Sequence, residues 1–229
     1  MFRVTLRFAQ VGLRETKKAK TRLAISAVAT AMFIERGFDA VTVAEVAAAA
    51  EVSAATIFNY FETKEDLFFD REAEMIAAQV RVIGERAAGE TIVAAIHRQL
   101  RAAIEDELPG LIERDVARFV ATAQASPALR ARVRLAIEKL EASLAAAIAA
   151  ETGATADDAT PRLVAGMIVG VERVLLDALR AQLERASSAA TVGRALRRDC
   201  DRAFALLQAG LGSYGAKPRS RRRRAAPAT

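Results

Sequence analysis

The segment TVAEVAAAAEVSAATIFNYFETKEDL, residues 42–67, constrains the fold of this chain more than any other, because three helices are expected to begin within it. Thr42 is followed three residues later by Glu45, the spacing of a capping box, in which each side chain binds the backbone N–H of the other residue. Ser53 and Thr63 are also residues that cap helix N-termini, and each precedes a helix-forming run. The segment therefore predicts three short, closely spaced helices.

A helix over residues 42–50, a tight turn at Glu51 and Val52, and a short helix over residues 53–61 together make a helix-turn-helix. In this motif the second helix enters the major groove of DNA. The pattern over residues 42–61 therefore predicts a DNA-binding protein.

Lys64 adds an indication of function, because it lies in the first turn of the helix that Thr63 caps. The helix dipole disfavours a cation there by roughly 0.3–1 kcal/mol, whereas a helix N-terminus with a lysine beside it suits an anion. Tyr60 would bring a phenolic O–H to the same place. Alternatively, Lys64 is only solvated and Tyr60 only packs; beside a helix-turn-helix, phosphate binding by both is favoured.

Together these fragments resemble the N-terminal domain of TetR-type transcriptional regulators. The match covers roughly residues 19–79 and rests on fragments in order at the family's spacings: FIERGF at 33–38, TVAEVA at 42–47, VS at 52–53, TIFNYF at 56–61 and KEDL at 64–67. The resemblance implies a sequence-specific regulator, a repressor by family default, that binds a palindromic double-stranded operator as a homodimer and responds to a small molecule.

The resemblance also implies two kinds of DNA contact. Four positions match those at which the family typically holds phosphates: Thr42, Thr56, Tyr60 and Lys64. Four others fall on or beside the exposed face of the recognition helix: Ser53, Ala54, Ala55 and Asn59. Asn59 is the best candidate for a base contact, since asparagine can pair bidentately with adenine.

Two positions depart from the family's pattern. Glu51 stands where glycine is common, so the turn is expected to form without a residue that freely adopts a positive φ. Glu62 stands where proline is common and puts a negative charge close to the expected phosphate.

Positive charge is concentrated at the two ends of the chain. Residues 1–25 and residues 215–229 each carry a net charge of +6, and since the whole chain carries +6, the body between them carries −6. Two basic ends on an acidic body are typical of arms that bind nucleic acid. For the C-terminal run, a disordered tail that only aids solubility is an equal alternative.

The composition predicts an all-α protein, since alanine, leucine, arginine and glutamate dominate long stretches and few strand-like alternations occur. No apolar run reaches membrane-spanning length, and Met1–Gln10 lacks the features of a secretory signal. The single Cys200 fits a reducing compartment. We therefore expect a cytoplasmic protein without a membrane partner.

About nine helices are expected, over residues 18–36, 42–50, 53–61, 64–84, 91–107, 111–125, 127–152, 161–186 and 192–211. In the first of these, the expected inward stripe is Ala24, Ala27, Val28 and Ala31. Pro109 and Gly110 are expected to end the fifth helix. The corresponding domains are a basic arm over 1–18, the DNA-binding domain over 19–79, an effector-binding and dimerisation domain over 80–212, and a basic tail over 213–229.

The last two helices, over 161–186 and 192–211, are the expected dimer surface. Small residues at Gly166 and Gly170 would allow two backbones to approach closely, with Leu163, Met167 and Val174 near the same face. Burial of these faces within one subunit is an alternative of equal weight on the sequence alone. The family resemblance favours the dimer.

The resemblance implies a small-molecule pocket formed by the helices over about residues 64–150. Candidates for its lining are Phe68, Phe69, Met75, His97, Phe119 and Met167. Plain core packing is the alternative for each of them, and for His97 a satisfied or solvent-facing ring is favoured. The apolar lining indicates a small hydrophobic effector.

An enzyme is the competing class of function. The chain has one histidine, one cysteine, no glycine-rich phosphate loop and no cluster of metal ligands, so no catalytic residue, cofactor or metal site is expected. An architectural DNA-binding protein without an effector is the stronger alternative. A saturable ligand that lowers operator affinity would distinguish a regulator from it.

Overall fold

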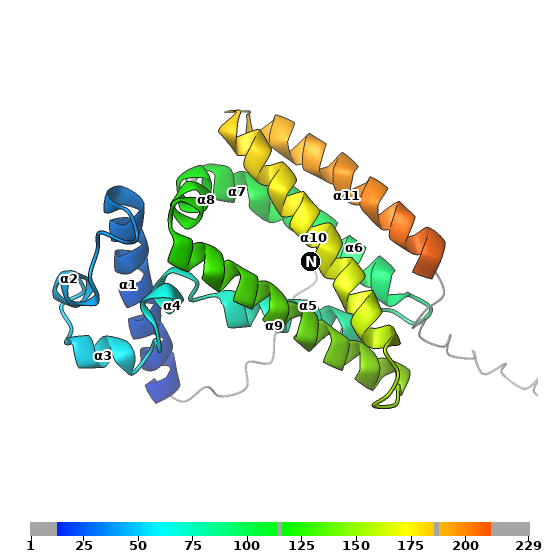
Figure 1. The fold of residues 1–229 in the computed structure, drawn as a ribbon, viewed down its shortest axis with the longest axis horizontal. Helices are drawn as coiled ribbons and strands as arrows, with labels where there is room; N and C mark the ends of the chain where they lie inside the picture. Colours follow the sequence, from blue (N-terminus) through cyan, green and yellow to red (C-terminus); the bar gives the residue numbers. More distant parts are fainter. Residues whose placement is uncertain (1–12, 114–115, 186–187, 212–229) are drawn as a thin grey trace, which may run out of the picture. The chain divides into compact units, whose positions relative to one another are not determined.

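The structure of the chain, a computed structural model, describes residues 13–113, 116–185 and 188–211, and every regular element within them is helical (Figure 1). This confirms the predicted all-α class. The basic tail expected over 213–229 and the first twelve residues of the expected arm lie outside the described residues. Residues 13–18 of that arm form the first turns of a helix. None of the described helices combines the length and apolar character that crossing a bilayer demands.

The described residues form two compact units. Unit 1 contains those up to Arg71 together with Ala121–Arg132, and unit 2 contains Glu72–Val120 and the residues from Val133 onward. Unit 1 therefore takes its residues from two separate stretches of the sequence.

Unit 1 is built around a cluster of aromatic and branched side chains. Its helices are α1 (Leu13–Arg36), α2 (Val43–Ala49), α3 (Ala54–Phe58) and α4 (Lys64–Phe68), with the end of α8 (Val116–Ala125) and the start of α9 (Pro127–Thr152). Phe33 is fully buried, and its ring centroid lies 4.9 Å from that of Phe38 and 6.2 Å from that of Phe68. Burying such rings is the main stabilising contribution expected in a unit this small.

The inward face of α1 differs from the predicted one. Ile25, Ala29 and Phe33, spaced four residues apart, are buried, whereas Ala24, Ala27 and Ala31 are exposed. The predicted stripe is wrong because the larger apolar side chains at 25 and 33 gain more from burial than the alanines do.

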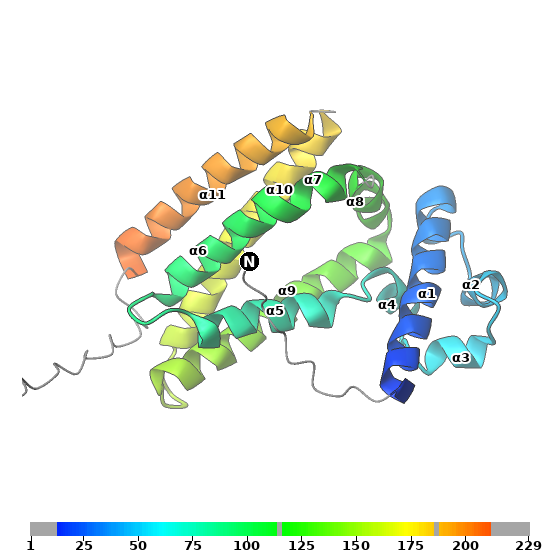
Figure 2. The ribbon, with the colours of Figure 1, turned by 180° about the vertical axis from the view of Figure 1, so that it is seen from behind.

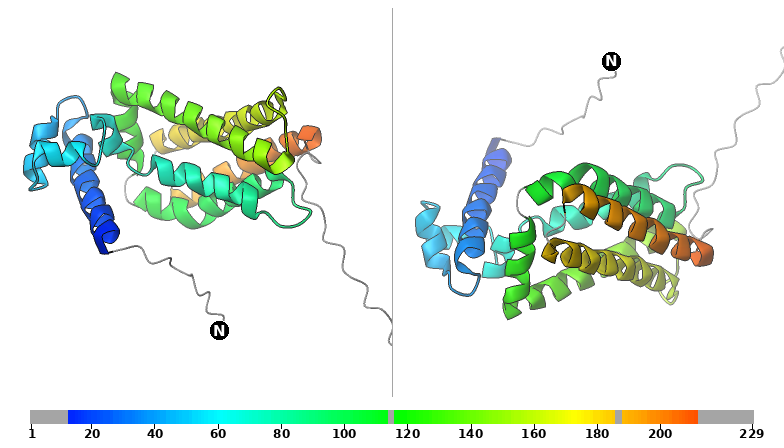
Figure 3. Two further views of the ribbon diagram at one scale, coloured as in Figure 1. Left: turned by 90° about the horizontal axis from the view of Figure 1, so that it is seen from below. Right: turned by 90° about the horizontal axis from the view of Figure 1, so that it is seen from above.

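Unit 2 contains α5 (Glu72–Glu85), α6 (Ile92–Ala102), the π-helical turn η1 (Ala103–Glu107), α7 (Leu108–Glu113), α10 (Thr160–Glu184) and α11 (Ala189–Leu211), with the remainder of α8 and α9. Its core joins side chains from several helices, including Ile83, Ile96, Leu144, Ile168 and Phe204. The long helices α10 and α11 lie side by side and antiparallel (Figures 1 and 3).

The helix predicted over residues 64–84 is interrupted. α4 ends at Phe68 and α5 begins at Glu72, with Phe69 outside helical geometry at φ −109° and ψ 39°. Asp70, in the interruption, is bound by two residues of α1: its backbone oxygen accepts from Arg22 at 3.3 Å and its carboxylate from Ser26 at 2.6 Å. These contacts offset the hydrogen bonds that a continuous helix would have made.

The stop predicted at Pro109 and Gly110 is also wrong, because α6, η1 and α7 follow one helical path to Glu113 (Figure 2). Proline cannot donate to the carbonyl four residues earlier, and its ring crowds that carbonyl. In the π-helical turn each backbone hydrogen bond spans five residues instead of four, and the Leu108 N–H donates to the Ala103 oxygen. This wider turn makes room for Pro109 without ending the helix.

Candidate nucleic-acid interface

The start of α2 is fixed by the predicted capping box. The Thr42 hydroxyl accepts a hydrogen bond from the Glu45 backbone N–H at 3.2 Å and donates to the Glu45 carboxylate at 2.8 Å. The same carboxylate accepts from the Thr42 backbone N–H at 2.7 Å and, with its other oxygen, from Arg36 at 2.6 Å. The Arg36 hydrogen bond, followed by those from Thr42, lowers the pKa of Glu45 to about 2. The local fold therefore already binds the hydroxyl expected to contact a phosphate.

The turn between α2 and α3 is formed by a non-glycine residue with a positive φ. Glu51 has φ 55°, so the turn takes a positive φ without the glycine that would adopt it freely. The left-handed conformation costs roughly 1–2 kcal/mol for an L-residue. Backbone hydrogen bonds hold the turn, among them the Val52 N–H to the Ala47 oxygen at 2.9 Å. Glu51 is exposed, so its charge faces solvent.

Ser53 caps α3, as predicted. Its hydroxyl oxygen accepts from the Thr56 backbone N–H at 3.0 Å and lies 2.8 Å from the Thr56 hydroxyl oxygen. Two residues expected at the interface are therefore hydrogen-bonded to each other, and this bond fixes the direction in which the short helix begins.

α3 has one face in the core and one in solvent. Ile57 is fully buried, whereas Ala54, Ala55 and Asn59 are exposed. Phe58 is 55% exposed, which is unusual for a phenylalanine. The sequence prediction did not include Phe58 in the interface. Phe58 directly follows Ile57, the buried residue of α3, and neighbouring residues of a helix point in different directions. This position is the signal in the sequence that would have indicated an exposed Phe58.

Lys64 has a structural role that its position at a helix N-terminus did not suggest. Its ammonium group donates to the Phe38 backbone oxygen at 2.6 Å and lies 4.2 Å from the centre of the Phe38 ring and 5.6 Å from that of Phe33. It thereby links the N-terminus of α4 to the loop after α1. An ammonium group has three donors, so two remain after the bond to Phe38.

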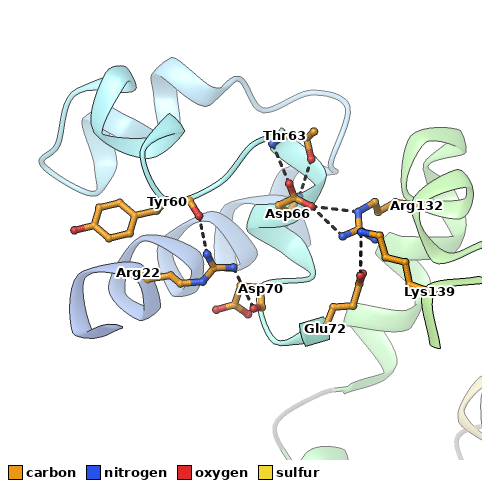
Figure 4. Close-up of polar contacts among 8 residues, drawn as sticks. All are labelled: Arg22, Tyr60, Thr63, Asp66, Asp70, Glu72, Arg132 and Lys139. Atoms are coloured by element: carbon orange, nitrogen blue, oxygen red, sulfur yellow. Dashed lines mark hydrogen bonds and ion pairs between the residues drawn. The ribbon is translucent and has the colours of Figure 1, made fainter. Parts of the chain in front are cut away.

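Arg22 positions the segment that carries Tyr60. Its guanidinium group donates to the Tyr60 backbone oxygen at 2.6 Å and to the Asp70 backbone oxygen, and lies 4.5 Å from the centre of the Phe61 ring. The Tyr60 ring points away from this contact (Figure 4). The phenol is therefore free of the interaction that fixes its backbone.

Asp66 joins two stretches of unit 1 (Figure 4). One of its oxygens accepts from the Thr63 backbone N–H at 3.0 Å, and the other accepts from Arg132 at 3.0 and 3.2 Å. Burial opposes ionisation of Asp66, but the hydrogen bonds from Thr63 and Arg132 outweigh it, so the pKa of this carboxyl lies below its ordinary value. A second link is the bond from the Ser126 hydroxyl to the Asp39 carboxylate at 2.9 Å.

The residues predicted to line an effector pocket lie in different places. Phe68 and Phe69 belong to unit 1, where their rings meet edge to face at 5.0 Å. The other four lie on separate helices of unit 2, namely Met75 on α5, His97 on α6, Phe119 on α8 and Met167 on α10. Met75 is 66% exposed and Met167 49% exposed.

His97 is hydrogen-bonded and stacked within unit 2. Its Nε2 lies 2.8 Å from the Asp201 carboxylate, and its ring is stacked on that of Phe204 with centroids 4.8 Å apart. These contacts match the favoured interpretation of a satisfied ring.

Comparisons with known proteins bear on the same two parts of the chain. A family model described as "Bacterial regulatory proteins, tetR family" matches residues 25–70. A second, described as "MftR C-terminal domain", matches residues 88–212, which is more than half of the chain.

Individual relatives agree with these family models. The HTH-type transcriptional regulator TcmR of Streptomyces glaucescens is 29% identical over 169 residues, which cover 72% of this chain and 75% of TcmR. A putative TetR-family regulator from Mesorhizobium loti is similar in structure with a TM-score of 0.51 and 25% identity, covering 86% of this chain and 98% of that one. GusR of Salmonella enterica has the same fold, with a TM-score of 0.53, 17% identity and coverage of 90% and 99%.

Proposed function

This chain belongs to the TetR family of DNA-binding transcriptional regulators, and we propose that it is a ligand-responsive repressor that binds a near-palindromic operator as a homodimer. The observation that carries the proposal is the solvent-facing side of α3, where a capped helix of one turn exposes Ala54, Ala55, Phe58 and Asn59. A recognition helix requires such a surface to reach base edges.

Base contacts in this proposal come from α3. Asn59 is exposed and would offer its amide to an adenine edge, while Phe58 and the two alanines would make apolar contact with thymine methyl groups. These contacts specify sequence, because the pattern of donors, acceptors and methyl groups in the major groove differs between base pairs.

Phosphate contacts in this proposal come from Thr42, Thr56, Tyr60 and Lys64. The Tyr60 ring points away from the Arg22 contact that holds its backbone (Figure 4). Lys64 keeps two ammonium donors after its bond to the Phe38 oxygen. The two threonines would exchange hydrogen bonds to Glu45 and Ser53 for bonds to phosphate. Such contacts set register and orientation on the duplex rather than sequence preference.

A second copy of the chain would cover an apolar face on α10 and α11. Leu163 is 62% exposed, Met167 49%, Val174 61% and Leu206 73%. The three α10 residues lie along one helical face, and Gly170 on the same face has no heavy atom within 4 Å of the place a Cβ would occupy. Exposed apolar residues gathered on one face favour association, and a two-fold dimer would present two copies of α3 to a near-palindrome.

In this proposal unit 2 binds a small apolar molecule. The dimer would bind its operator in the cytoplasm, and the bound molecule would change its affinity for that operator. Repression would be relieved if the molecule binds more tightly to the conformation that does not fit the operator. An architectural DNA-binding protein without an effector is the alternative outcome of the experiment below.

The proposal is tested by footprinting the purified full chain on the DNA flanking its own gene, at two salt concentrations. Asn59→Ala is compared with Gln124→Ala, which removes an exposed amide from the same unit but away from α3. We expect a discrete near-palindromic footprint for the wild type and for Gln124→Ala, and affinity about tenfold lower or more for Asn59→Ala. Salt-sensitive coverage without a discrete footprint would support the architectural alternative.

A further inference from the structure

A carboxylate and an amide meet at the edge of the unit 2 core. The Gln79 side-chain nitrogen, on α5, donates to the Glu172 carboxylate, on α10, at 3.2 Å. Both residues are partly exposed as wholes, but the other Glu172 oxygen and the Gln79 carbonyl oxygen are buried. The pair therefore lies just beneath the surface rather than at the centre of the core.

These two buried oxygens lack hydrogen-bond partners among the described residues. No arginine, lysine or histidine in the described part of the chain pairs with Glu172. Burial of this carboxyl raises its pKa to about 7, and the bond from Gln79 only partly opposes that effect. Buried polar atoms are almost always satisfied in folded proteins, so a pair of free acceptors at one place requires an explanation.

The surroundings of the pair are apolar. On α10, Ile168, Val169 and Leu175 belong to the buried core and Val171 packs against it, and Val80 on α5 does the same. The Cys200 thiol, also buried in this core, has a raised pKa because of its burial and, to a smaller extent, the charges of Asp201 and Glu172. Glu172 and Gln79 are thus polar groups beside an apolar core, and a few polar groups among apolar side chains are what give ligand sites orientation and specificity.

We infer that Glu172 and Gln79 form the polar end of the effector site and bind a lipophilic primary ammonium ion, which donates N–H groups to both free oxygens. This inference rests on the proposed function, since it names the class of ligand that unit 2 would sense. The apolar part of the ligand would contact the side chains of α5 and α10 around the pair.

The chemistry of the two groups selects this class over others. Both free atoms accept hydrogen bonds, and one of the two Gln79 N–H groups already donates to Glu172. A primary ammonium group has three donors and a positive charge, whereas an alcohol has one donor and no charge. A cation also replaces the missing counter-ion of a buried carboxylate.

The inference is tested by calorimetry on the full chain without DNA, with 4-phenylbutylamine as the probe and 4-phenylbutan-1-ol as its neutral counterpart. Glu172→Gln keeps the shape of the side chain and removes its charge. Glu141→Gln, on α9, removes a partly buried carboxylate of the same unit outside the pair and is the matched control. Circular dichroism establishes that both variants remain folded.

We expect the wild type and Glu141→Gln to bind the amine, and Glu172→Gln to bind it at least about tenfold more weakly. The alcohol should bind the wild type and Glu172→Gln alike. Equal binding of amine and alcohol by the wild type, equal binding of the amine by Glu172→Gln, or no binding of the amine would each overturn the inference. Because DNA is absent, these outcomes do not depend on operator binding, and a failed footprint would leave them unchanged.

Discussion

Glu51 is the one non-glycine residue with a positive φ among the described residues. Its positive φ costs roughly 1–2 kcal/mol, whereas glycine adopts that φ freely but loses about 0.5–1 kcal/mol more in conformational freedom on folding. We therefore expect Glu51→Gly to raise the free energy of unfolding by about 0.5–1 kcal/mol in urea denaturation. Glu51→Gln keeps the strained φ and is the control. An equal rise in the free energy of unfolding of both variants would show that the effect comes from removing the Glu51 charge and not from the φ angle.

Glu172 should make stability depend on pH. Its pKa rises from the ordinary 4.5 to about 7 in the folded chain. Between these values the native state retains a proton that the unfolded state has lost, so wild-type stability falls as pH rises through this interval and becomes level above it. The loss is about 3 kcal/mol, from about 1.4 kcal/mol per pH unit over this interval.

Glu172→Gln cannot ionise and should lack this contribution. The stability advantage of Glu172→Gln over the wild type should therefore grow between pH values near 5 and near 8 when both are unfolded in urea. A difference that stays constant over this range would show that the carboxyl titrates normally in the folded state.

Residue-level contacts were predictable where they are local. Thr42, Ser53 and Thr63 cap their helices through partners three residues ahead, and that spacing is visible in the sequence. Lys64 and Arg22 bind carbonyl groups 26 and 38 residues away, and no local pattern indicates such partners. The structural role of Lys64 was therefore missed.

At the scale of elements, the N-terminus of α4 depends on the start of α9. The Asp66 and Arg132 side chains are only 21% and 12% exposed, so solvent screens their interaction weakly. A double-mutant cycle of Asp66→Ala and Arg132→Ala should give a coupling free energy of about 1–3 kcal/mol.

The same cycle made with Asp158→Ala in place of Asp66→Ala is the control, because Asp158 is an exposed acidic residue outside unit 1. Its coupling with Arg132 should be near zero. Additive effects in the Asp66 cycle, measured by thermal and urea denaturation, would contradict the proposed dependence.

Helix existence was predictable from composition and caps, but helix breaks were not. The interruption at residues 69–71 is held by tertiary contacts to Asp70, which no propensity describes. The continuation through Pro109 depends on a π-helical turn, which is rare and has no sequence signature strong enough to compete with a proline. In α1, many alanines weakened the hydrophobic stripe, and the predicted face differed from the buried one.

At the scale of the whole molecule, the apolar face of α10 and α11 predicts a dimer. Met167→Glu and Leu163→Glu each place a charge on this face and should shift the chain toward the monomer in size-exclusion chromatography with light scattering. Leu135→Glu, on α9, replaces a similarly exposed leucine away from this face and is the control. Unchanged mass in the two α10 variants, or an equal shift in the control, would indicate a different interface.

The fold class and the family were accessible from the sequence because composition and an ordered set of short motifs carry them. The pair of unsatisfied acceptors was not, because Gln79 and Glu172 lie 93 positions apart. Only the packing of α5 and α10 brings them together.

The two-part composition of unit 1 has a consequence for how such regulators are inherited and recombined. A gene fusion joined after Arg71 would separate Asp39 and Asp66 from their partners Ser126 and Arg132. A chimera that takes both stretches of unit 1 from the same parent, the one up to Arg71 and Ala121–Arg132, preserves both links. A chimera that exchanges only the stretch up to Arg71 breaks them. The stretch up to Arg71 should therefore be inherited together with the junction of α8 and α9.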